Sequence, residues 1–595
     1  MKKGGGRPFF KTIRTLFSTL HNQTNKPKMD ERYSYNPKLK WNSKVEEYFI
    51  KAYGVDHFSK ISKALARPSC YSCIRVNTLK STSDAVIEKL LEIELRSAVL
   101  GYGQDNLITK CQIPGLDYVL FVKGSGPHTI TYGDAASTPP KEVLVSRKCA
   151  EAVLRGAQVF VPGVLACSAH VEIGDRVSVS VAVEQPGSEN KWGVGITRGT
   201  ILQGTLTGKK YNVALRTDIA FNMPDPYYSE RSGLYIGQGT THMSRAGMFR
   251  ASEGIAVEMT ERVFDLPSFH SLLEGEIFLQ NLPSIITAHV LDPQQGERIL
   301  DMCAAPGGKT TAIAILMRDK GEIIAMDRSH NKVLDIKKLA AEMGISCITP
   351  YRLDALKSVC QNNESIEFAT QHCVKEPVGA KCDCTGLCES PNGDMTSIAT
   401  KKCQPDVGNE GGGKYLSKAE TRKNIRRLKN GPGRSHSVGG RVEKEKGFFP
   451  GSFDRVLLDA PCSALGLRPR LFAGEESVES LRKHGKYQRK MFDQAVQLVR
   501  PGGIIVYSTC TINPGENEAL VRYALDTYKF LSLAPQNPRI GGPGLVGHCE
   551  LFDGEITEEW LRPGEEELVQ RFDPSSSLDT IGFFIAKFKV AQKDS

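Results

Sequence analysis

With 595 residues, the chain is too long to fold around a single hydrophobic core, and roughly two to four domains are expected. Apolar residues make up 40% of it, and no segment approaches the roughly 20 consecutive apolar residues of a membrane span, which excludes an integral membrane protein. The formal net charge of +10 fits an anionic partner such as nucleic acid, although a slightly basic enzyme would carry it equally well.

The 16 cysteines have no regular spacing and follow no secretory signal, which indicates a reducing compartment. We therefore expect a soluble, cytoplasmic monomer without membrane attachment. The first 28 residues leave a second location open, because they contain seven basic residues, no acidic residue and interleaved apolar side chains. An organellar transit peptide, for example to mitochondria, has this pattern, and so does a disordered basic extension.

Residues 29–140 are predicted to form an α+β extension. Val45, Tyr48, Phe49 and Ala52 are spaced for one face of a helix, and the helical pattern ends in a short strand at residues 73–78. A helix at residues 85–95 and a strand at 118–122 follow, and glycines with a Pro-Pro pair mark a boundary near residue 140.

Residues 141–246 read as a small β-barrel, because short apolar stretches alternate with glycine turns. A helix is expected at residues 149–156, with strands at 159–161, 170–181, 195–197, 204–206 and 233–237. The order of a helix, Arg-Gly-Ala, Pro-Gly-Val and Gly-Asp-Arg-Val resembles a PUA domain, an RNA-binding barrel module. A barrel of another kind is the alternative.

Residues 247–590 have an α/β pattern. Apolar strands are predicted at residues 296–301, 321–327, 345–350, 453–459 and 504–510, with helices at 311–317, 331–344 and 488–499 between them. A last strand at residues 582–590 suits the edge of the sheet. Strand, glycine turn and helix around residue 307 form the first unit of a Rossmann-like fold.

A basic, glycine-rich segment at about residues 359–450 interrupts this pattern and reads as a disordered insertion. Five of its cysteines and His372 lack the paired spacing of a zinc site, so no metal is predicted. The basic run at residues 418–429 could be an RNA-binding tail or a solvated loop. The five thiols are Cys373, Cys382, Cys384, Cys388 and Cys403.

Polar residues follow the predicted parallel strands, whose carboxyl ends meet in one crevice. Asp327 closes the second strand, where a carboxylate can accept the two hydroxyls of a ribose. The turn at residues 303–309 lacks the full dinucleotide pattern, so a nucleoside such as S-adenosylmethionine fits better than a dinucleotide. Cys462 and Cys510 lie beside this crevice, and either could be a reactive thiolate or a small buried apolar residue.

Three motifs together resemble those of the Nop/Sun-domain RNA cytosine-5 methyltransferases. They are Cys303-Ala-Ala-Pro-Gly-Gly-Lys-Thr310, Asp459-Ala-Pro-Cys-Ser463 and Ser508-Thr-Cys-Thr511. Ile74-Arg-Val-Asn-Thr78 matches the RNA-binding N-terminal extension of that family. A PUA-like domain placed before the catalytic domain is similar to the sixth Sun-domain branch, which modifies tRNA near its 3′ end. The resemblance covers most of residues 30–590.

The resemblance implies a Rossmann-like S-adenosylmethionine-dependent methyltransferase domain, an inserted β-barrel PUA domain and an α+β N-terminal extension. It also implies that the Cys510 thiolate attacks carbon 6 of cytosine, that Asp459 contacts the base, and that Cys462 assists release of the product.

For the cofactor, the resemblance implies that Asp327 binds the ribose, Asp354 binds the adenine amine and Asp459 lies near the methionine moiety. Lys309 either orients the site or forms a salt bridge on its helix. The turn supplies the other contacts, through Cys303, Ala304, Ala305, Pro306, Gly307, Gly308 and Lys309.

The sequence therefore predicts an RNA (cytosine-5)-methyltransferase that acts on tRNA near its acceptor end. On charge and position alone, Lys209, Lys210 and Arg245 are candidates for RNA contact. Two alternatives are a methyltransferase for ribosomal or messenger RNA and a non-catalytic RNA-binding assembly factor. Loss of Cys510, Asp459 or the 303–309 turn would mark an assembly factor, and all three are present.

Overall fold

The computed structural model describes residues 32–97, 107–132, 140–186, 192–202, 229–269, 272–360, 447–551 and 554–593. The basic leader, Lys209, Lys210 and these five cysteines of the predicted insertion lie outside these segments, so the predictions made for them stay predictions. Within the described segments, no helix is both long enough and apolar enough to cross a bilayer.

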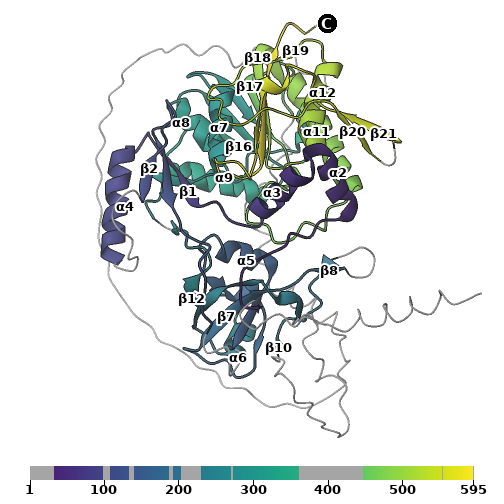
Figure 1. The fold of residues 1–595 in the computed structure, drawn as a ribbon. Coiled ribbons are helices and arrows are strands. Elements are labelled where there is room, and N and C mark those ends of the chain that lie inside the picture. The colour runs from purple at the N-terminus through teal and green to yellow at the C-terminus, as the bar shows by residue number, and fades with distance from the viewer. Residues whose placement is uncertain are drawn as a thin grey trace, which may run out of the picture. The chain divides into compact units, whose positions relative to one another are not determined.

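The largest sheet has eight strands in the order β16-β15-β14-β17-β18-β23-β19, with β22 also paired to β23 (Figure 1). The first five strands of this order are parallel, which is the predicted Rossmann-like arrangement. The strands are β14 Arg298–Asp301, β15 Glu322–Asp327, β16 Ile348–Arg352, β17 Phe453–Asp459, β18 Val499–Thr509, β19 Leu531–Leu533, β22 Val569–Phe572 and β23 Phe583–Val590.

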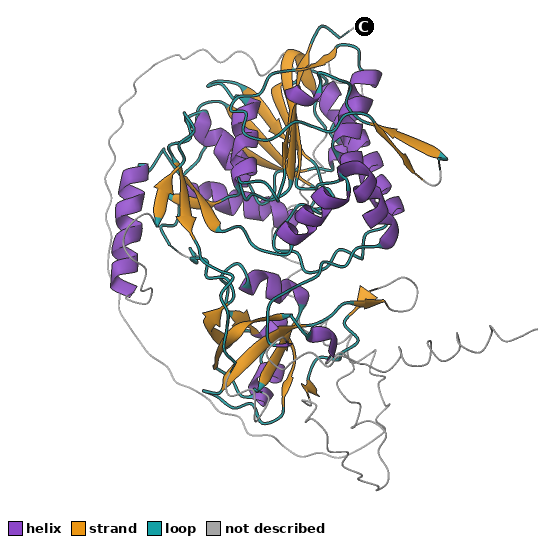
Figure 2. Cartoon of the chain, viewed as in Figure 1, coloured by secondary structure: helices purple, strands orange, loops and turns teal. Residues whose placement is uncertain are grey.

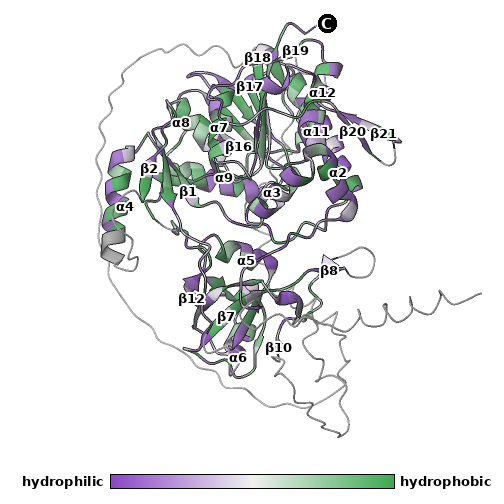
Figure 3. Cartoon of the chain, in the orientation of Figure 1, coloured by the Kyte–Doolittle hydropathy of each residue, from purple (hydrophilic) through white to green (hydrophobic). Residues whose placement is uncertain are grey.

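Consecutive residues of the central strands belong to two separate cores, because successive strand side chains point to opposite faces. Ile299 and Ile323 pack in one core with α7, α8 and α9, whereas Leu300 and Ile324 pack in the other with α11 and α12. Figure 2 shows the sheet between helices, and Figure 3 shows its central strands as largely apolar. The helices are α7 Leu282–Leu291, α8 Gly308–Leu316, α9 His330–Met343, α11 Val478–Leu498 and α12 Glu518–Thr527.

Strand β23 lies inside the sheet, so the prediction of an edge strand was wrong. It pairs with β18 on one side and with β19 and β22 on the other, in every case antiparallel. Its apolar side chains explain this position, since Phe584, Ile585 and Phe588 are fully buried and fill both cores.

The N-terminal extension begins with two short helices, α2 and α3, and also contains helix α4 and a separate four-stranded sheet, ordered β13-β1-β3-β2. Gly54, at φ 79°, separates the helices where the sequence suggested one continuous pattern. Strand β13 completes the sheet, although the predicted boundary placed it in the catalytic domain. The elements are α2 Ser43–Tyr53, α3 Val55–Leu65, β1 Tyr71–Val76, α4 Ser83–Ser97, β2 Ile108–Lys110, β3 Val119–Lys123 and β13 Ile277–Leu279.

The barrel segment contains a seven-stranded sheet in the order β10-β6-β4-β7-β11-β12-β5. Its last strand in sequence, β12, lies beyond the predicted boundary at residue 246, because it pairs with both β11 and β5. The strands are β4 Glu142–Val145, β5 Val159–Phe160, β6 Val164–Ser168, β7 Arg176–Val181, β10 Thr200–Leu202, β11 Tyr235–Thr241 and β12 Ile255–Arg262, with helices α5 Arg147–Val153 and α6 Arg245–Arg250.

No strand forms at residues 195–197, where the sequence suggested one. Gly195 and Gly199 have φ values of 61° and 96°, and left-handed backbone of this kind interrupts an extended conformation. Ile196 nevertheless packs against the buried cluster that contains Leu144 and Leu202. This apolar side chain therefore contributes to the barrel core although it lies in a loop. The predicted strand at residues 204–206 lies outside the described residues.

We predict that Phe588→Ala destabilises the protein by about 3–5 kcal/mol, because it removes a ring from a fully packed core. The ring is fully buried and its centroid lies 5.1 Å from that of Phe492. Phe449→Ala is the matched control, since the Phe449 side chain is 51% exposed. Denaturant unfolding followed by circular dichroism measures both changes, and equal losses in the two variants would contradict this packing.

Candidate active site

Strands β17 and β18 are parallel neighbours, and their ends bring two of the predicted motifs together. Asp459, the last residue of β17, lies opposite Ser508, and the Ser508 hydroxyl donates a hydrogen bond of 2.7 Å to Asp459 Oδ1. Cys462 lies in the loop after β17, and Cys510 directly follows β18. The structure therefore brings Asp459, Cys462 and Cys510 close together at the ends of these two strands.

The two thiols touch, with their Sγ atoms 3.4 Å apart. The hydrogen bond from Cys462 lowers the pKa of Cys510 below its usual value, although burial opposes this effect, and the Lys309 charge lowers it further. The same hydrogen bond, in which Cys462 is the donor, holds the pKa of Cys462 well above its usual range, and burial raises that pKa too. Of the two thiols, Cys510 is therefore the more acidic.

Lys309 forms an ion pair with Asp459 across the crevice. Its Nζ atom lies 2.7 Å from Asp459 Oδ2 and 5.3 Å from the centroid of the Phe583 ring. Burial alone would lower the pKa of Lys309, but the Asp459 carboxylate raises it above its ordinary value. The ammonium therefore stays charged, and its ion pair joins α8 to the end of β17, where it can also orient the site.

The loop between β14 and α8 is shaped by its two glycines. Gly307 has a φ of 106°, and a Cβ there would lie 3.3 Å from Leu339. At Gly308 a Cβ would lie 2.9 Å from the Phe278 ring, so only glycine fits both positions without a shift. The backbone N–H of Ala304 donates to the Met326 carbonyl at 2.9 Å, which joins the loop to β15.

Asp301, the last residue of β14, was not among the predicted site residues. It is 1% exposed, and its Oδ2 accepts a hydrogen bond of 2.8 Å from Thr310. Its Oδ1 is buried without a hydrogen-bond partner among the described residues. Burial raises the pKa of this carboxyl from 3.8 to about 7. A carboxylate that closes a buried strand before a glycine turn was the signal available in the sequence.

The two predicted cofactor carboxylates lie at the ends of the next strands. Asp327 Oδ1 accepts a hydrogen bond from the Ser329 N–H at 3.0 Å, and Asp354 Oδ1 accepts one from the Leu356 N–H at 3.1 Å. Cys303 lies among the carboxylates: burial, Asp301, Asp459 and Asp327 together raise its pKa well above the usual range. Cys303 therefore stays a neutral thiol.

Tyr487, on helix α11, is a second residue that the sequence did not indicate. Burial raises its pKa, and the charge of Asp354 raises it further. The helix was predicted to begin at residue 488, whereas α11 begins at Val478, and no motif singled out this tyrosine. Its partly buried ring packs against the core that contains α11.

A cavity of about 640 Å³ opens beside the 303–309 loop. The loop, Asp301 and Asp459 line one side, and Tyr71, Phe278 and Gln280 line another. Asp327, Asp354, Cys462 and Cys510 are not among the lining residues, so the cavity covers only the Lys309–Asp459 side of the site. Its size and its aromatic and charged lining suit a nucleotide-sized ligand.

Arg245 contributes to the structure of the barrel, where the sequence suggested a contact with RNA. Its Nη2 donates to the Gly199 carbonyl, and its guanidinium lies 5.3 Å from the centroid of the Phe249 ring. These contacts hold α6 against the loop before β10. Arg245 is half-buried and therefore a poorer RNA contact than its charge alone indicated.

The parallel sheet, the small-residue turn and the acidic strand ends define a Rossmann-like methyltransferase. Residues 288–368 and 386–589 match the family model described as 16S rRNA methyltransferase RsmB/F. The chain belongs to the family of Nop/Sun-domain RNA cytosine-C5 methyltransferases, as the motifs predicted, and its relatives along nearly the whole length support this assignment.

One such relative is the rRNA (cytosine-C(5))-methyltransferase NOP2C of Arabidopsis thaliana, 62% identical over 99% of this chain and 97% of its own length. The tRNA (cytosine(72)-C(5))-methyltransferase NSUN6 of Mus musculus is 33% identical over 90% of each chain. The crystal structure of NSun6 from Pyrococcus horikoshii with SFG has a TM-score of 0.59 and 25% identity, covering 93% of this chain and 99% of that one.

The cofactor is S-adenosylmethionine, as predicted, since SFG in the Pyrococcus horikoshii structure is an analogue of it. The described residues fit this group. The glycine turn leaves the backbone of the loop open, Asp301 Oδ1 offers a buried acceptor without a partner, and Asp327 and Asp354 follow the next two strands. The Rossmann-like fold is likewise confirmed, and a seven-stranded sheet occupies the segment for which a PUA domain was predicted.

We predict that Asp301→Asn becomes more stable relative to the wild type as the pH rises from about 4 to about 7. The folded wild type keeps a proton on Asp301 up to about pH 7, whereas the unfolded chain loses it near 3.8. The free energy of unfolding of the wild type therefore falls by about 1.4 kcal/mol per pH unit between these two pKa values. The Asn side chain does not titrate, so the variant does not show this decrease.

Unfolding of both proteins at several pH values measures the difference. Asp319→Asn is the control, because hydrogen bonds from Ser346 and Cys347 outweigh burial and lower the pKa of Asp319. Its contribution changes only below pH 4, so its difference from the wild type should stay flat. A flat difference for Asp301→Asn as well would contradict the buried, protonated carboxyl.

Proposed function

We propose that this RNA cytosine-C5 methyltransferase acts on tRNA near the 3′ acceptor end, through a covalent adduct of Cys510. The main support is the domain organisation, because relatives named tRNA (cytosine(72)-C(5))-methyltransferase match about nine-tenths of the chain, extension and barrel included. The barrel and the extension lie outside the family model, and they provide surface that can position an RNA end beside the crevice.

The thiol pair supports the proposed chemistry. Carbon 5 of cytosine is a weak nucleophile until a group adds to carbon 6, and Cys510 is the more acidic of the two thiols and so the better source of a thiolate. Its attack forms the S–C6 bond and shifts the electron pair of the C5–C6 double bond toward C5 and the ring. Asp459, held by Lys309 and Ser508, would accept a hydrogen bond from the exocyclic amine of the base and so orient the ring for attack.

S-adenosylmethionine, when bound, supplies the methyl group that carbon 5 accepts. Asp327 would hold the ribose hydroxyls, Asp354 the adenine amine, and the 303–309 loop the methionine moiety. After carbon 5 loses its proton, the S–C6 bond breaks and Cys510 leaves as a thiolate. Cys462, which keeps its proton and lies 3.4 Å from Cys510, is placed to assist this release.

Ribosomal RNA is the second candidate substrate. The Arabidopsis thaliana relative, at 62% identity over almost the full length of both chains, is named an rRNA methyltransferase. A non-catalytic assembly factor is less well supported, because an enzyme that had lost its function would have no need to keep Asp459, Lys309 and the two thiols in contact.

We predict that the wild type transfers methyl groups to tRNA about tenfold or more faster than to ribosomal RNA. We also predict that Cys510→Ala lowers tRNA methylation by about a thousandfold or more, as expected for loss of a covalent nucleophile. Transfer of a labelled methyl group, followed by bisulfite sequencing of the product, measures both. Cys347→Ala is the control, because this half-buried thiol directly precedes β16 and is not one of the proposed catalytic cysteines.

Faster methylation of ribosomal RNA would overturn the proposed substrate and leave the chemistry intact. Full activity of Cys510→Ala would overturn the nucleophile. A folded wild type that methylates neither RNA would favour the assembly factor.

A further inference from the structure

Glu516 connects the loops that carry the two thiols. It ends the short helix η5 (Pro514–Glu516), which follows Cys510, and its side chain is fully buried. Its Oε2 accepts a hydrogen bond of 3.0 Å from the Ser463 N–H, and its Oε1 accepts one from the Ser463 hydroxyl. Ser463 directly follows Cys462. Both oxygens of one carboxylate therefore accept hydrogen bonds from the residue next to Cys462.

Two more donors hold the same carboxylate in place. Gln488 Nε2, on α11, lies 2.7 Å from Oε2, and Asn513 Nδ2 lies 2.9 Å from Oε1. Gln488 also donates to the Pro461 carbonyl at 3.0 Å, and Tyr507 donates to the Glu516 carbonyl at 2.7 Å. The four donors to the carboxylate are neutral, and hydrogen bonds of this kind fix the position of a buried carboxylate.

This arrangement acts on the geometry and the charge of the thiol pair. The Ser463 and Thr511 hydroxyl oxygens lie 2.8 Å apart, so the residues after each cysteine also contact one another. The Glu516 charge is one of the causes that keep the pKa of Cys462 high, after its hydrogen bond to Cys510, burial and the Cys510 charge. The same charge raises the pKa of Cys510 as well, so Glu516 acts on the pair mainly by holding the Cys462 loop close to Cys510.

We propose that Glu516 is a positioning residue that sets the balance between formation and release of the covalent RNA adduct. It holds the Cys462 loop against the Cys510 loop, so that the Cys462 thiol can act when Cys510 must leave. Because the Glu516 side chain is fully buried, its effect passes through Ser463. The inference rests on the proposed function, because it takes Cys510 as the nucleophile and Cys462 as the residue for release.

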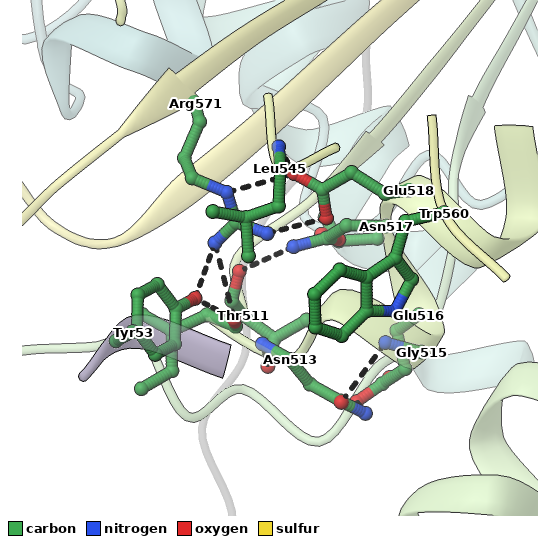
Figure 4. A network of polar contacts seen from close by, with 12 residues as sticks. Tyr53, Thr511, Asn513, Gly515, Glu516, Asn517, Glu518, Leu545, Trp560 and Arg571 are labelled. Atoms are coloured by element: carbon green, nitrogen blue, oxygen red, sulfur yellow. Dashed lines mark hydrogen bonds and ion pairs between the residues drawn. The ribbon is translucent and has the colours of Figure 1, made fainter. Parts of the chain in front are cut away.

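Glu518 provides a matched control in the same loop. It is also fully buried, but it faces a different neighbour, as Figure 4 shows. Its Oε1 accepts hydrogen bonds from Arg571 Nε at 2.9 Å and from the Leu545 N–H at 3.0 Å, and its Oε2 pairs with Arg571 Nη2. Glu518 thus anchors the start of α12 to β22, and none of its hydrogen bonds goes to Ser463.

The experiment compares Glu516→Gln, Glu518→Gln and Cys462→Ala in the full-length protein with tRNA and S-adenosylmethionine. Two quantities are measured: the methylation rate, and the fraction of protein that stays attached to RNA on a denaturing gel. In Glu516→Gln the new amide cannot accept from every donor that faced the carboxylate, so the Cys462 loop loses its anchor. The adduct fraction should rise about tenfold or more over the wild type, toward the level of Cys462→Ala, while the methylation rate falls.

Glu518→Gln should lower the melting temperature and leave the adduct fraction at the wild-type level. If the role of Glu516 were purely structural, Glu516→Gln would give the same result. A wild-type adduct fraction in folded Glu516→Gln would overturn the inference. If Glu516→Gln fails to fold, Ser463→Ala decides, because it removes one donor and should raise the adduct fraction to a smaller extent.

Cys462→Ala separates the two proposals. If it accumulates adduct and the Glu516 and Ser463 variants do not, only the role of Glu516 is wrong. If Cys462→Ala itself forms no adduct with tRNA, the proposed release step fails, and the role of Glu516 fails with it.

Discussion

The parallel pairing of β17 with β18 is the constraint on which the site depends. Their register sets Asp459 opposite Ser508, and the chain then needs only a few residues to bring Cys462 and Cys510 into contact. Residues almost fifty positions apart in the sequence become neighbours through backbone hydrogen bonds deep in the sheet. Both strands are covered by helices on each face, so the position of the strand ends is fixed by two cores at once.

Charge is distributed unevenly over this small region, and the distribution separates the roles of similar groups. The hydrogen bond from Cys462 lowers the pKa of Cys510, whereas Cys303 stays neutral because burial and three carboxylates oppose its charge. Asp459 is paired with Lys309, whereas Asp301 is buried with one oxygen unpartnered and keeps its proton to about pH 7. Three thiols and two carboxyls thus behave differently within one crevice, as active sites commonly require.

The sequence predicted the catalytic sheet and its motifs well, because buried parallel strands leave continuous apolar runs that end in polar residues. It failed where partners come from distant segments. Strand β13 pairs with β1 although the entire barrel segment separates them in the sequence. Strand β23 lies inside the sheet because β19 and β22 pair with its outer side. Glu516 and Tyr487 were missed for the same reason, since their roles depend on Ser463 and Asp354, which the fold alone brings near.

The central claim is that Cys510, rather than Cys462, bonds to the cytosine. A tRNA containing 5-fluorocytidine tests it most directly, because fluorine at carbon 5 prevents the proton loss that precedes release and so retains the adduct on the wild-type protein. After nuclease and protease digestion, mass spectrometry should find the nucleotide on the peptide that contains Cys510 alone. A nucleotide attached to the Cys462 peptide would contradict the account.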